Sequence, residues 1–176
     1  MKKTLLIPLI AAISFGSHAL TLTSNDIQEG TRMADTFAFQ GFGCTGDNVS
    51  PQLQWKDAPQ GTKSFAITAY DPDAPTGSGW WHWVALDIPA SQNSVDRGAS
   101  GKLDGMREMN NDYGVAGFGG ACPPKGHGMH RYQFTVWALP TEKLELPSNP
   151  SNALIGYMLN ASALDSAKLT ATYVSE

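Results

Sequence analysis

Two segments of the chain hold carboxylate and imidazole side chains that together could form a site for an anion. The first contains Asp71, Asp73 and His82, and the second contains His127 and His130. Apart from one histidine among the first 19 residues, every histidine of the chain lies in these two segments. Imidazole N–H groups can donate to phosphate or carboxylate oxygens, and a nearby carboxylate favours the charged imidazole. If the fold brings the segments together, we expect an anion site that binds more tightly as the pH falls through the histidine pKa.

Stiff backbone should hold the two carboxylates in place. Residues 64–70 alternate between apolar and polar side chains, as a strand does, and they lead directly to Asp71. A residue before proline is pushed toward extended geometry, so Asp71, which precedes Pro72, should end this strand. An aspartate in such a turn commonly bonds its own backbone, and we therefore interpret Asp73 as structural.

His82 lies in a second alternating run, residues 80–88. It has the same parity as Val84, Leu86 and Ile88, so it should face the core if they do. The alternative to a ligand-binding role is a core histidine that bonds the nearby carboxylate. A concave site would be walled by aromatic and proline side chains, namely Trp80, Trp81, Pro123, Pro124 and Tyr132.

The remaining pattern predicts a mostly β protein whose antiparallel sheets stack as a sandwich. Further strands are expected at residues 36–39, 50–55, 131–139 and 168–174. We interpret residues 50–55 as an edge strand because Pro51 stands near its start. Asn149 and Pro150 suit the N-cap and first position of a helix that should extend to about Ala161.

The N-terminus has the pattern of a secretory signal. Lys2 and Lys3 precede an almost wholly apolar run, which small residues follow. We interpret residues 1–19 as a signal peptide cleaved after Ala19, and residues 20–176 as a single domain. The apolar run is too short for an ordinary membrane span, and no later stretch approaches the required length. The mature protein is therefore expected to be periplasmic or secreted.

The net charge argues against nucleic acid as a partner. Removal of the leader would also remove two lysines and would change the formal net charge from −4 to −6. An acidic domain has no general attraction for nucleic acid or for an anionic membrane surface. Any anion site must therefore depend on local groups.

The chain has two cysteines, Cys44 and Cys122. Disulfides persist in an oxidising compartment, and we expect these two residues to pair. The bond would join the loop around Gly43 to the segment that contains Pro123 and Pro124. The alternative is two free thiols.

Four longer motifs stand in order along the chain. They are Asp-Pro-Asp-Ala-Pro at 71–75, Trp-His-Trp at 81–83, Pro-Pro-Lys-Gly at 123–126 and Gly-Met-His-Arg-Tyr at 128–132. Together they resemble the signature segments of the phosphatidylethanolamine-binding protein (PEBP) family, in particular its bacterial Raf-kinase-inhibitor-like branch. Residues 50–55 and 61–66 extend the match upstream, so it covers nearly the whole mature chain. Several long motifs in order are far more specific than one short pattern.

The resemblance implies a PEBP-like antiparallel β-sandwich with a few short helices, one of them near the C-terminus, and a small anion pocket. Carried over by motif, the pocket would contain Asp71, Trp80, His82, Cys122, Pro124, His130 and Tyr132. The backbone around Cys122 would supply further donors. His127 falls at a variable position of the motif and is left out of the pocket. The cysteine pair departs from intracellular relatives, which typically lack it, and this difference fits an exported member.

These residues also allow two chemical alternatives to anion binding. A metal site could use His127 and His130, with Asp71 and His82 completing the set, but the glycine between the first two and the lack of cysteine ligands argue against structural zinc. A small hydrolase could use the Asp/His pocket, but the chain has no Gly-x-Ser-x-Gly nucleophile motif. We expect a protein that binds a small anionic or phosphorylated ligand, with no catalysis and no cofactor.

The resemblance also permits a role toward other proteins. Relatives include kinase regulators and protease inhibitors, so the pocket could capture a phosphorylated or acidic protein partner and modulate or inhibit it. A homodimer is an alternative to a monomer on the resemblance alone.

Overall fold

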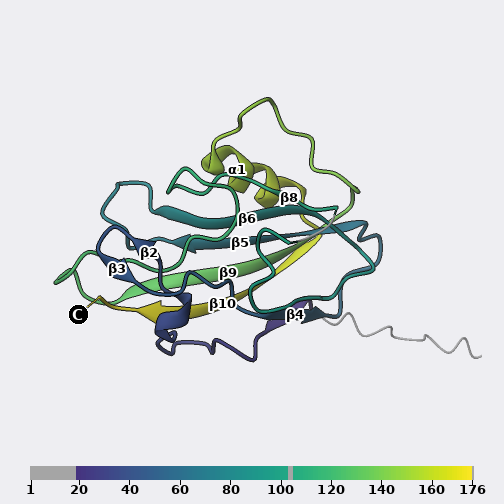
Figure 1. The fold of residues 1–176 in the computed structure, drawn as a ribbon. Helices are drawn as coiled ribbons and strands as arrows, with labels where there is room; N and C mark the ends of the chain where they lie inside the picture. The colour runs from purple at the N-terminus through teal and green to yellow at the C-terminus, as the bar shows by residue number, and fades with distance from the viewer. Residues whose placement is uncertain (1–18, 103–104, 176) are drawn as a thin grey trace, which may run out of the picture.

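The computed structural model describes residues 19–102 and 105–175 (Figure 1). The predicted signal peptide, residues 1–19, lies outside the described residues except for Ala19. In the part of the chain that the structure describes, no helix is long and apolar enough to cross a membrane.

Five antiparallel strands form the main sheet. They are β5 (Ser64–Asp71), β6 (Trp80–Pro89), β8 (Arg107–Glu108), β9 (His130–Leu139) and β10 (Asp165–Tyr173). Their order across the sheet is β10-β9-β5-β6-β8. The strands expected at 64–70, 80–88, 131–139 and 168–174 are therefore confirmed. The central strand β5 is buried along both faces, because the sheet is covered on each side.

A smaller antiparallel sheet lies against one face of the main sheet. It consists of β1 (Thr21–Thr23), β4 (Leu53–Lys56) and β7 (Ser94–Val95), in the order β1-β4-β7. The prediction of an edge strand at residues 50–55 is wrong, because β4 pairs on both sides. Pro51 does not interfere, since it lies two residues before β4 begins.

The segment 36–39 is not a strand. Residues Asp35–Phe37 form a short 3-10 helix, η1, in which the Ala38 N–H donates to the Asp35 carbonyl over 2.9 Å. This turn buries Phe37 in the core. Two very short strands, β2 (Gln40–Gly41) and β3 (Cys44–Thr45), follow it as a hairpin.

Two apolar clusters separate the layers of the fold. The larger cluster lies between the sheets and includes Trp55, Phe65 and Phe134. The second lies under helix α1 (Asn152–Ser162), where Val84 of β6 packs with Ile155 of the helix. Figure 1 shows α1 on one side of the main sheet and β4 on the other. The expected mostly β, antiparallel architecture is confirmed, with an α-helix near the C-terminus covering the outer face.

Helix α1 begins two residues later than expected. Ser151, not Asn149, is its N-cap, and its hydroxyl accepts the Leu154 N–H over 3.2 Å. Asn149 has a φ of 52°, a left-handed conformation that leads into the helix without capping it. Pro150 therefore stands before the N-cap, where its missing N–H has no helical role.

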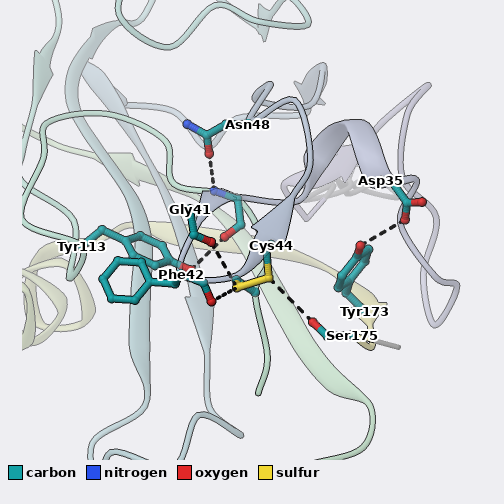
Figure 2. The surroundings of a disulfide bond; sticks show 10 residues. Asp35, Gly41, Phe42, Cys44, Asn48, Tyr113, Tyr173 and Ser175 are labelled. Atoms are coloured by element: carbon teal, nitrogen blue, oxygen red, sulfur yellow. Dashed lines mark hydrogen bonds between the residues drawn. A yellow bond between two sulfur atoms is a disulfide. The ribbon is translucent and has the colours of Figure 1, made fainter. Parts of the chain in front are cut away.

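The predicted disulfide between Cys44 and Cys122 is confirmed (Figure 2). It joins β3 to a segment 78 residues away in the sequence. Beside it, the Gly120 N–H donates to the side chain of Asn48 over 2.7 Å. The disulfide therefore fixes the β2–β3 hairpin to the rest of the domain.

Candidate functional site

A cleft of about 380 Å³ opens at one end of the main sheet. All seven residues predicted for the pocket line it, namely Asp71, Trp80, His82, Cys122, Pro124, His130 and Tyr132. The strand topology explains the convergence, because Asp71 ends β5 and pairs with Trp80, which begins β6. β9 begins at His130 on the other side of β5, so three strand ends meet at the cleft.

Asp71 and His130 form a buried pair at the base of the cleft. The His130 Nδ1–H donates to Asp71 Oδ2 over 2.7 Å, and both side chains are at most 3% exposed. The other carboxylate oxygen, Oδ1, accepts the Asp73 N–H over 2.8 Å. Asp71 therefore orients His130, and neither of its oxygens lacks a donor.

Asp73 is engaged outside the cleft. Its carboxylate accepts two hydrogen bonds from the Arg131 guanidinium and one from the Arg131 backbone. These bonds lower the pKa of Asp73 to about 2. The structure therefore agrees with a structural role for Asp73, but the partner of its carboxylate is Arg131 rather than the backbone of its own turn.

His127 lies closer to the site than the motif suggested. Its Nδ1 is 2.7 Å from Nε2 of His130, the ring nitrogen that Asp71 leaves unused. His127 is exposed, so the two rings form a path from the buried carboxylate to solvent. The three-residue spacing of these histidines was the signal, and the variable motif position concealed it.

His82 is buried, as its parity suggested, but it does not lie with Val84 and Leu86. The register between β5 and β6 shifts at this point, so that Ala69 pairs with Trp83 and Tyr70 with Trp81. His82 is the extra residue of this bulge and turns toward the cleft. There its ring packs edge-on against Tyr132, with the ring centroids 5.0 Å apart.

The His82 ring bonds a backbone carbonyl rather than a carboxylate. Its Nδ1 lies 2.7 Å from the Gly119 oxygen. A carbonyl can only accept, so Nδ1 carries the proton. Burial lowers the pKa of His82, while the Gly119 carbonyl and Asp71 act in the opposite direction. The histidine that Asp71 orients is therefore His130, and the alternative in which His82 bonds Asp71 is wrong.

Three buried polar atoms of the cleft have no hydrogen-bond partner among the described residues. They are Nε2 of His82, the Tyr132 hydroxyl and Nε1 of Trp80. Buried polar groups are rarely left unpaired, because each costs about 1–3 kcal/mol. These three atoms are therefore the strongest sign of a ligand site in this part of the chain.

An aromatic wall that the sequence did not predict closes one side of the cleft. Tyr113 stacks on Phe39 with ring centroids 3.9 Å apart, and it contacts Trp80 and His82 edge-on. Figure 2 shows Tyr113 beside Phe42, close to the disulfide. The Tyr113 hydroxyl donates to the Gly120 carbonyl, so this tyrosine is held in place by the fold.

Trp81 does not wall the cleft. It packs on the opposite face of the main sheet, under α1, where it contacts Gly156. A Cβ at Gly156 would come within 2.7 Å of the Trp81 ring, so the glycine makes this packing possible. Strand alternation separates Trp81 from Trp80, which faces the cleft.

Comparison with known proteins identifies the family. The family model for phosphatidylethanolamine-binding protein matches residues 23–174. The chain belongs to the PEBP family. The resemblance carried by the four sequence motifs is therefore confirmed.

Bacterial PEBP relatives match over most of the chain. UPF0098 protein YbcL of Escherichia coli strain K12 is 50% identical over 181 aligned residues, covering 98% of both chains. UPF0098 protein YbhB of the same strain is 44% identical, covering 88% of this chain and 99% of the relative. The crystal structure of YbcL, described as a new member of the mammalian PEBP family, gives a TM-score of 0.86. The match covers 90% of this chain and 100% of the chain in that crystal structure.

The PEBP cleft offers no arrangement suited to a metal. Within residues 19–102 and 105–175, no three His, Cys, Asp or Glu side chains are grouped so that they could hold an ion. His127 and His130 face one another over 2.7 Å, which leaves no room for an ion between them.

The buried His82 should make the stability of this PEBP protein depend on pH. In the unfolded chain a histidine titrates near pH 6.5, whereas burial lowers the pKa of His82 in the fold. The unfolded state therefore binds a proton that the folded state does not. We expect the free energy of unfolding to fall below pH 6.5 by up to about 1.4 kcal/mol per pH unit.

Denaturant titrations between pH 8 and pH 5 test this expectation. His82→Gln should lose this part of the pH dependence, whereas His127→Gln, at an exposed ring nearby, should retain it. An unchanged pH dependence in His82→Gln would show that other groups cause it.

Proposed function

We propose that this PEBP protein is an exported binding protein for a small anionic or phosphorylated group, with no catalysis of its own. The observation that carries the proposal is the set of three unpartnered buried atoms on His82, Tyr132 and Trp80. All three side chains line the same cleft. A bound oxyanion would accept hydrogen bonds from Trp80 and Tyr132, and one that carries a proton would also donate to Nε2 of His82.

Local charge supports an anion despite the acidic chain. Lys125 lines the cleft, and the indole of Trp80 can only donate. The nearby carboxylate of Asp71 is already bonded by His130 and by the Asp73 N–H, so less of its charge repels an anion. Of the backbone donors expected around Cys122, the Ala121 N–H is already bonded to the Phe37 carbonyl. Side chains are therefore the main donors that we propose.

Tyr132→Phe tests the proposal most directly. The change removes a buried hydroxyl whose proton has no acceptor among the described residues, although the Cys122 backbone lies near its oxygen. We expect the free energy of unfolding to stay the same or to rise by up to about 1 kcal/mol. Phosphate affinity should fall roughly tenfold, because a hydrogen bond to a charged group is lost. Denaturant titration and calorimetric titration with inorganic phosphate and with phosphoethanolamine measure the two effects.

Tyr113→Phe is the matched control. Its hydroxyl also lies at the cleft, but it donates to Gly120, so its removal should lower stability and affect phosphate binding less. If Tyr132→Phe binds phosphate with the same affinity as the wild type, the Tyr132 hydroxyl does not contribute to the binding site. If the wild type binds neither probe, the proposal fails as a whole.

Export and a protein partner are parts of the same proposal. The disulfide and the leader pattern of residues 1–19 support an oxidising compartment. We propose that the protein modulates a periplasmic or secreted protein partner through this cleft, and that ligand occupancy of the cleft controls the interaction. Capture from periplasmic extract, with and without competing phosphate, tests whether a partner uses the cleft. A captured protein that phosphate does not displace would contradict a cleft-mediated role.

A further inference from the structure

The cleft presents a mixed set of hydrogen-bonding atoms. Nε1 of Trp80 is a donor only, and the Tyr132 hydroxyl can donate or accept. His82 differs from both, because its tautomer is fixed from behind by Gly119. With the proton on Nδ1, the neutral ring has a bare Nε2 that can only accept. A fully ionised anion can satisfy the first two groups but not this nitrogen.

The surroundings of His82 support a neutral ring at neutral pH. The ring is 3% exposed, and burial is the main effect that lowers its pKa. The charged groups that act on it are Asp71 and Asp112, and neither forms a hydrogen bond with the ring. The flanking rings of Tyr113 and Tyr132 carry no charge near neutral pH, because burial raises the pKa of both hydroxyls.

We propose that this cleft selects oxyanions that carry their own proton, such as hydrogen phosphate, over fully ionised oxyanions such as sulfate. The inference rests on the proposed anion-binding function and specifies its ligand class. The P–OH of hydrogen phosphate donates to His82 Nε2, while its other oxygens accept from Trp80 and Tyr132. Sulfate has no proton near neutral pH, so it binds only when His82 first takes one from solvent.

Calorimetric titration of the wild-type protein with inorganic phosphate and sulfate, at equal ionic strength, tests the inference. At pH 7.5 we expect phosphate to bind at least tenfold more tightly than sulfate. Between pH 7.5 and pH 5.5 the affinity for sulfate should rise by up to about tenfold per pH unit, as His82 becomes protonated. The affinity for phosphate should rise less, so the two affinities should converge.

Two variants distinguish the contribution of His82 to ion selectivity from that of the other cleft groups. His82→Gln places a non-titrating amide near the position of Nε2, and the amide can turn to donate or to accept. We expect this variant to bind both ions with similar affinity and little pH dependence. Trp80→Phe removes a donor that either ion can use, so both affinities should fall while their ratio stays.

The outcomes distinguish this inference from the proposed function. Equal affinities for the two ions at pH 7.5, or parallel pH dependence, would overturn the selectivity and leave anion binding intact. Binding of neither ion would overturn both. If His82→Gln does not fold, the phosphate and sulfate affinities of the wild-type protein still test the selectivity. A ¹⁵N spectrum of the histidine rings gives a second measurement, and a proton on Nε2 of His82 near neutral pH would contradict the inference.

Discussion

Replacing Cys44 and Cys122 together by serine is expected to lower the free energy of unfolding by about 4 kcal/mol. The disulfide closes a loop of 78 residues, and a cross-link of this span restricts the unfolded chain strongly. The effect is large relative to the total stability of about 5–15 kcal/mol that is usual for a domain. Denaturant titration of the double variant and of the wild type under oxidising conditions measures it.

Reduction of the wild type provides the control for the cysteine variant. A dithiol reductant should lower the stability of the wild type to nearly that of Cys44→Ser/Cys122→Ser and should leave the variant unchanged. Agreement between the two would assign the loss to the cross-link rather than to the serine side chains. A loss below about 1 kcal/mol would mean that the unfolded chain is already compact without the bond.

Asp71→Ala is expected to lower the free energy of unfolding by on the order of 3 kcal/mol. The carboxylate accepts from two donors, the His130 Nδ1–H and the Asp73 N–H. Removing it leaves both without this acceptor, and His130 is 1% exposed. Phosphate binding should weaken as well, because His130 lines the cleft and its orientation would no longer be fixed. Unfolding titrations and phosphate calorimetry measure these losses.

Two further variants serve as controls for the stability loss expected of Asp71→Ala. Asp71→Asn should lose less stability, because its amide can donate to His130 if the imidazole proton moves to Nε2, where His127 can accept it. Asp73→Ala lies two residues away and breaks a partly exposed ion pair with Arg131, so it should cost only about 1 kcal/mol. A loss in Asp71→Ala no greater than that in Asp73→Ala would contradict the buried pair.

The main elements of the fold could be predicted from the sequence because the strands follow local rules. Alternation marked β5, β6 and β9, and the Pro72 that follows Asp71 marked the end of β5. The misassigned elements, namely 36–39, the edge strand at 50–55 and the N-cap at Asn149, depended on neighbours. β4, for example, is central only because β7 pairs with it from far along the chain.

The candidate site likewise has features that the sequence predicted and features that depend on tertiary contacts. Residue types and motifs identified Asp71, His82 and His130, because these side chains carry the chemistry themselves. The sequence could not reveal which histidine Asp71 bonds, since the bulge at His82 arises from the pairing of two strands. It also gave no sign of the Tyr113 wall, which a loop brings to the cleft.

The sequence by itself therefore determined the family, the strand pattern, the cysteine pair and the chemical groups of the cleft. Only the tertiary structure decided their partners: Asp71 with His130, His130 with His127, and His82 with the Gly119 carbonyl. The physical reason is that strand periodicity is a local property of the chain. Hydrogen-bond direction and tautomer, in contrast, depend on atoms that meet only when distant segments pack together.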